Sequence, residues 1–125
     1  MRAASALAVL ALACGPAVVD YRVVRTPSGR PLRVESVSTL DAGDEPVLLL
    51  EYHSDVDLSD TPALQAEVDD AWRWLRPQAE AGGHRVAVIR AARWKTGWEP
   101  SGRAAEFAVA RSESGAWKLA EATAP

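Results

Sequence analysis

The sequence contains one long amphipathic segment of helical period, residues 62–81, set between two groups of strand-like segments. Apolar residues recur there at the spacing of one helix face, which predicts a helix with one buried side. Because no other part of the chain shows such a stripe, we expect strands to supply the rest of the core. The stripe consists of Leu64, Val68, Ala71, Trp72, Leu75 and Ala79.

Local signals mark the ends of this helix. Thr61 is a suitable N-cap residue, and Pro62 suits the first helical position, where a missing N–H costs nothing. Pro77 is expected to kink or loosen the helix, and Gly82 with Gly83 should end it.

Strand-like segments flank the helix on both sides. The run at 47–54 is apolar on both faces, which indicates a central strand, and a slip of the alternation at Val37 suggests a bulge. The order βββ-α-βββ predicts an α+β fold with a mostly antiparallel sheet of five to six strands and one main helix on one face. We expect one domain over 19–120 and a tail at 121–125. The predicted strands are 19–26, 32–40, 47–54, 85–94, 103–111 and 116–120.

Two lone charges occupy apolar rows of the strands on either side of the helix. They are Glu51 and Arg90. A right-handed crossover through the helix would place these strands parallel and close together. Since a buried charge is tolerated best beside its opposite, we predict a direct Glu51–Arg90 contact.

Composition excludes several classes of protein. The 125 residues carry 14 basic and 17 acidic side chains, so the chain lacks the positive field of a nucleic-acid-binding protein. One cysteine excludes a disulfide framework within the chain, and two histidines leave little for a histidine-based metal site. No apolar run reaches the roughly 18 to 20 residues that span a bilayer.

The amino terminus has the layout of an export signal. Met1 and Arg2 precede an apolar run at 3–13, which ends in Ala11-Leu12-Ala13 directly before Cys14. This segment resembles a bacterial lipoprotein signal, in which the cysteine ends the lipobox.

The resemblance implies that residues 1–13 are a signal peptide, that Cys14 carries a diacylglyceryl group, and that 14–18 form a lipidated tether. The protein would then be exported and anchored to the cell envelope by its lipid, facing the periplasm. Gly15 after the cysteine favours sorting to the outer membrane. Two alternatives stay open: plain secretion after cleavage at the same Ala-x-Ala site, and a cytosolic protein with an Ala-rich start.

Residues that could take part in catalysis or metal binding cluster at the end of the predicted strand 47–54 and in the loop after it. Glu51 and His53 share one strand face and could form an acid–base pair. Asp55, Asp57 and Asp60 alternate like the start of a calcium loop. An EF-hand would also need glycine at the position of Asp60, so a solvated strand-to-helix loop is the favoured interpretation of these acids.

Five tryptophans are many for this length. We expect Trp72 and Trp117 in the core. Trp94 and Trp98 flank a short loop segment that could bind a sugar, a peptide or the membrane interface, or could fold back over the end of the sheet.

These patterns favour a non-catalytic binding or accessory module of the cell envelope, with no cofactor and no metal. The sheet face without a helix is expected to bury against a partner protein, against a second copy or under the N-terminal strands. The alternative is a small hydrolase or metal-dependent enzyme that uses Glu51, His53 and the aspartate loop. An enzyme would need a pocket that gathers these groups, whereas a binding module needs an open apolar face. A structural spacer without a specific ligand is a third interpretation.

Overall fold

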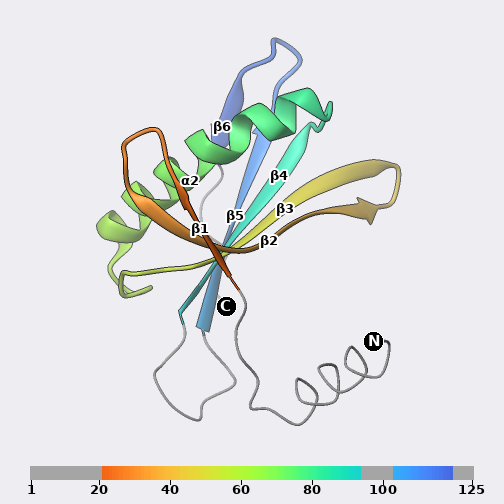
Figure 1. The fold of residues 1–125 in the computed structure, drawn as a ribbon. Helices are drawn as coiled ribbons and strands as arrows, with labels where there is room; N and C mark the ends of the chain where they lie inside the picture. Colours follow the sequence, from red (N-terminus) through yellow and green to blue (C-terminus); the bar gives the residue numbers. More distant parts are fainter. Residues whose placement is uncertain (1–20, 94–102, 120–125) are drawn as a thin grey trace, which may run out of the picture.

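The computed structural model describes residues 21–93 and 103–119. Six strands form one sheet in the order β1-β2-β3-β4-β5-β6, and one helix connects β3 to β4 (Figure 1). The α+β class and the order βββ-α-βββ predicted from the sequence are therefore confirmed. The elements are β1 (Arg22–Arg25), β2 (Pro31–Ala42), β3 (Glu45–His53), α2 (Thr61–Ala81), β4 (Val86–Arg93), β5 (Arg103–Arg111) and β6 (Trp117–Leu119).

The helix determines how the sheet is paired. Strands β3 and β4 are parallel, because α2 carries the chain back to the edge where β3 began. The other neighbouring pairs are antiparallel. Figure 1 shows α2 along one face of the sheet. The opposite face has no helix over it among the described residues, and we call it the open face.

The start of α2 differs by one residue from the prediction. Asp60 is the N-cap, and its carboxylate Oδ1 accepts the Ala63 N–H at 3.3 Å. Thr61, the predicted cap, is instead the first helical residue, with Pro62 directly behind it in the first turn. The helix continues through Pro77 to Ala81, and Gly83 follows with a φ of +70°, a conformation that suits glycine.

The predicted bulge in β2 lies earlier than Val37. The register of β2 against β3 shifts between Val34 and Ser36. Val34 therefore faces the helix while Ser36 faces away from it, opposite Glu51 of β3. The bulge places a hydroxyl opposite Glu51, where strict alternation would have placed Glu35.

The core lies between α2 and the covered face of the sheet. Side chains from β2 to β5 and five of the six residues of the helix stripe are almost fully buried there, which confirms the predicted phase of the helix; the sixth, Trp72, is half-buried. The largest fully buried residues are Tyr52, Leu50, Leu75, Ile89, Val34, Val68 and Val109.

The two tryptophans expected in the core lie at its edge. Trp72 and Trp117 are half-buried and pack edge to face on each other, with ring centroids 4.8 Å apart. The indole Nε1–H of Trp117 points to Glu80 Oε2 at 3.3 Å, and the Arg111 guanidinium lies over the same ring. The predicted core positions are thus confirmed only in part: both rings pack against the core but are only half-buried, because β6 is the edge strand of the sheet.

The ring pair generates a stability prediction. We expect Trp72→Ala to lower the free energy of unfolding by about 2 kcal/mol, less than the roughly 3–5 kcal/mol of a fully buried aromatic ring. In a double-mutant cycle with Trp117→Ala, the coupling should be about 1 kcal/mol, since each ring loses its partner. Chemical denaturation of the two single variants and the double variant gives both values. Strict additivity would show that the two rings contribute independently.

Candidate functional site

Glu51 and His53 lie on the open face of β3, as their spacing predicted. Glu51 is half-buried and accepts the Ser36 hydroxyl at Oε1, at 3.2 Å. Arg90 is its direct neighbour on β4 and is exposed. Among the ion pairs of the described residues, however, none joins Glu51 to Arg90. The predicted neighbourhood is confirmed and the predicted ion pair is wrong, because Ser36 satisfies Glu51 and Arg90 extends into water.

His53 is surrounded by β2 and the start of β1 rather than by Glu51. It is 8% exposed, its Nε2 lies 3.4 Å from Glu35 Oε2, and the ring of Tyr21 lies 5.5 Å away, centroid to centroid. Burial lowers the pKa of His53 below its ordinary value; Glu35 opposes this shift and Arg33 adds to it. Folding therefore shifts the protonation equilibrium of His53 toward the neutral imidazole.

The aspartate loop does not converge on one point. Asp57 accepts the backbone N–H and the hydroxyl of Ser59 at 2.9 and 2.8 Å, and Asp60 caps the helix. Asp55 pairs with Arg33. Within residues 21–93 and 103–119, no group of three or more His, Cys, Asp or Glu side chains is arranged to hold a metal ion.

A buried carboxylate that the sequence analysis missed ties α2 to the end of β3. Glu67 is only 3% exposed. Its Oε1 accepts the hydroxyls of Tyr52 and Ser54 at 2.8 and 2.6 Å, and its Oε2 accepts the Asp55 N–H at 3.1 Å. Burial, and then the neighbouring Glu67 charge, raise the pKa of Tyr52 far above its ordinary value. The signal was available, because Glu67 lies three residues after Leu64, on the apolar stripe.

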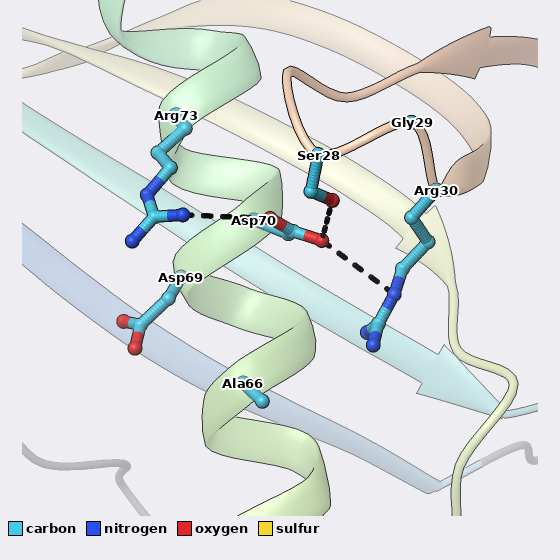
Figure 2. A pocket seen from close by; sticks show the side chains of 7 residues that line it. All are labelled: Ser28, Gly29, Arg30, Ala66, Asp69, Asp70 and Arg73. Atoms are coloured by element: carbon cyan, nitrogen blue, oxygen red, sulfur yellow. Dashed lines mark hydrogen bonds and ion pairs between the residues drawn. The ribbon is translucent and has the colours of Figure 1, made fainter.

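A pocket of about 700 Å³ separates the β1–β2 turn from α2 (Figure 2). Asp70 lies at its centre and is 7% exposed. Its Oδ2 accepts the Ser28 hydroxyl at 2.5 Å and lies 3.5 Å from Arg30 Nε, while its Oδ1 lies 3.9 Å from an Arg73 nitrogen. The lining residues are Ser28, Gly29, Arg30, Ala66, Asp69, Asp70 and Arg73.

This pocket is polar and balanced in charge, with two guanidinium groups and two carboxylates. Asp70 accepts one hydrogen bond from the β1–β2 turn and lies between two guanidinium groups, so the carboxylate holds the turn against the helix. The pocket includes neither Glu51 nor His53, which lie on the other face of the sheet. The residues proposed for an enzyme are therefore not gathered in it.

In contrast to the polar pocket beside α2, the open face carries exposed apolar side chains. Leu40 on β2 is 47% exposed, Val23 on β1 is 60% exposed, and Tyr21, directly before β1, is 44% exposed. Leu49 and Val88 are half-buried on the two central strands. In the part of the chain that the structure describes, Tyr21, Val23 and Leu40 are the large hydrophobic side chains that are exposed.

The buried His53 generates a pH prediction. Its folded-state pKa lies below the unfolded value of about 6.5, so the unfolded chain binds more protons just below that pH. This contribution to stability is complete above about pH 6.5 and is lost as the pH falls toward the lowered pKa. Urea denaturation at about pH 7.5 and about pH 5 should show a smaller loss of stability for His53→Gln than for wild type.

Glu35→Gln is the second variant of this test. It removes the carboxylate that offsets the effect of burial on the pKa of His53. The loss of stability between about pH 7.5 and about pH 5 should therefore be larger in Glu35→Gln than in wild type. If the free energy of unfolding depends on pH in the same way in wild type and in His53→Gln, His53 is not the group that causes the loss of stability at acid pH.

Three predicted site residues, Cys14, Trp94 and Trp98, lie outside the described residues. Among the residues described, no helix combines the length and the apolar character needed to cross a membrane.

Comparisons of the chain with protein-family models, with curated protein sequences and with solved structures found no match.

Proposed function

We propose that this protein is a non-catalytic binding or accessory module of the bacterial cell envelope, exported and anchored by lipid on Cys14. The observation that carries the binding role is the open sheet face, with apolar side chains exposed from β1 and β2. The resemblance of residues 1–15 to a lipoprotein signal supports the anchor.

The lipid would be attached to the only cysteine of the chain. Cys14 follows an apolar run of export-signal length. In an oxidising compartment a lone thiol at the mature terminus risks pairing between chains, and thioether lipidation removes that risk. Two or three acyl chains hold a protein stably where one does not.

The anchor would also keep the domain near the membrane. Residues 15–21 separate Cys14 from the first residue of β1. Even fully extended, a segment of this length reaches only about 25 Å, at roughly 3.3–3.6 Å per residue. The domain would therefore meet partners that share its membrane or lie just above it.

The distribution of polar groups favours binding over catalysis. Glu51 and His53 lie on an open face and contact different partners, and the aspartates of the following loop are engaged locally. The pocket beside α2 is lined by another set of residues. Catalysis requires acid, base and substrate in one concave site, which supports the binding module over the hydrolase.

Lipidation of Cys14 has a direct test. The protein should fractionate with membranes, and the intact mass of the mature chain should show cleavage before Cys14 and added acyl groups. Cys14→Ser should abolish both the acyl mass and the membrane association while leaving the fold unchanged by circular dichroism. A water-soluble wild-type chain with an unmodified cysteine, or one that retains Met1, would contradict the anchor.

The binding surface can be tested by site-specific photo-cross-linking in intact cells. A photo-reactive residue in place of Leu40, on the open face, should give one discrete adduct. The matched control replaces Arg76, whose side chain is 52% exposed on the helix, and should give none. Equal adduct patterns from the two positions, or no adduct from Leu40, would remove the support for the open face as a binding surface.

A further inference from the structure

We infer that the open face binds a second copy of this chain, sheet against sheet. The two copies would be related by a two-fold axis that lies in the interface between the two sheets, parallel to β3 and β4 and above the line midway between them. The inference rests on the proposed binding role of this face and names its partner. Three features of the face support it: the order of its charges, the position of its apolar rows and its size.

Three charges and one hydroxyl form a row across four neighbouring strands. Register pairs place Ser36 beside Glu51, Glu51 beside Arg90, and Arg90 beside Glu106. All four therefore lie at one level of the open face. Arg90 is the cation at the centre of this row and is exposed.

A two-fold axis between β3 and β4 makes this row complementary to itself. Rotation brings β3 of one copy opposite β4 of the other and keeps each residue at its own level along the strands. Glu51 then faces Arg90 of the second copy, and Arg90 faces its Glu51. On the flanks, Ser36 faces Glu106. A symmetric interface needs this kind of self-complementary patch.

The apolar rows match under the same rotation. Next to the charged row, Leu49 of β3 would face Val88 of β4, and one level further Val47 would face Val86. These side chains are half-buried in the single chain and would be covered in the pair. Leu40, 47% exposed on β2, lies at the edge of the same level. Face-to-face sheets pack about 10 Å apart, which leaves room for one interdigitated layer of such side chains.

The size of the face fits a modest dimer. Strands β2 to β5 at about 4.8 Å spacing, with about eight residues each at about 3.3 Å, give roughly 500 Å² per copy. Two copies would bury about 1,000 Å², at the lower limit of specific interfaces. Lipid anchoring would favour such an interface, since confinement to one membrane raises the effective concentration.

Charge exchange between two tagged copies tests the arrangement. Full-length chains with two different C-terminal tags are co-expressed, extracted in mild detergent and purified through one tag. Wild type should co-purify with wild type. A pair of Arg90→Glu chains brings two carboxylates together at each contact, and a pair of Glu51→Arg chains brings two guanidinium groups together. Because like charges oppose each other across the interface, each pair should lose about tenfold or more of the co-purified copy.

The decisive sample mixes the two variants. Arg90→Glu with Glu51→Arg gives one contact between the two introduced side chains, which are opposite in charge, and one between the two native side chains, which are also opposite. Co-purification should therefore return. This rescue also shows that both variants fold. Arg76→Glu, an equal charge reversal on the exposed side of α2, is the matched control and should co-purify like wild type.

The outcomes separate this inference from the proposed function. Wild-type self-association that survives Arg90→Glu, or a mixed pair that is not rescued, overturns the two-fold arrangement. Absence of wild-type self-association, with a Leu40 adduct to a different protein, overturns the dimer and leaves the binding module standing. If neither self-association nor a Leu40 adduct is observed, the dimer and the binding role of the open face both lose their support.

Discussion

The parallel pairing of β3 with β4 is the constraint on which the rest of the structure depends. It exists because the chain between these strands is one helix, and a helical crossover returns the chain in the same direction. Because a single helix connects these two strands, α2 covers only one face of the sheet. The same connection therefore produces the core on one side and the open face on the other.

Buried acids on α2 decide how the helix sits on the sheet. Apolar packing alone is non-directional and would let the helix slide or rotate. Glu67 accepts three hydrogen bonds from the end of β3 and the loop after it. Asp70 accepts the Ser28 hydroxyl from the β1–β2 turn. An unpaired buried carboxylate is costly, so these contacts penalise other helix positions and fix α2 to one end of the sheet, where β3 ends beside the β1–β2 turn.

The sequence could predict the elements because their periodicity follows from burial on one face. It could also predict that Glu51 and Arg90 are neighbours, since the handedness of the crossover leaves few alternatives. It could not predict which partner each charge takes. That choice depended on the β2 bulge, which placed Ser36 against Glu51, and on the length of the arginine side chain, which lets its head reach water.

The missed site residues have a related explanation. Glu67 and Asp70 occur on or beside the apolar stripe, and hydrophobic periodicity is carried by the apolar positions and does not indicate which acids are buried. Their partners Tyr52 and Ser28 come from distant parts of the chain, so only the tertiary structure reveals the hydrogen bonds. On the open face, Glu51 and Arg90 are register neighbours on the two central strands. Opposite charges held side by side at one level are costly to cover with an apolar partner but fit their own two-fold image, which is why this surface favours a second copy over a purely apolar ligand.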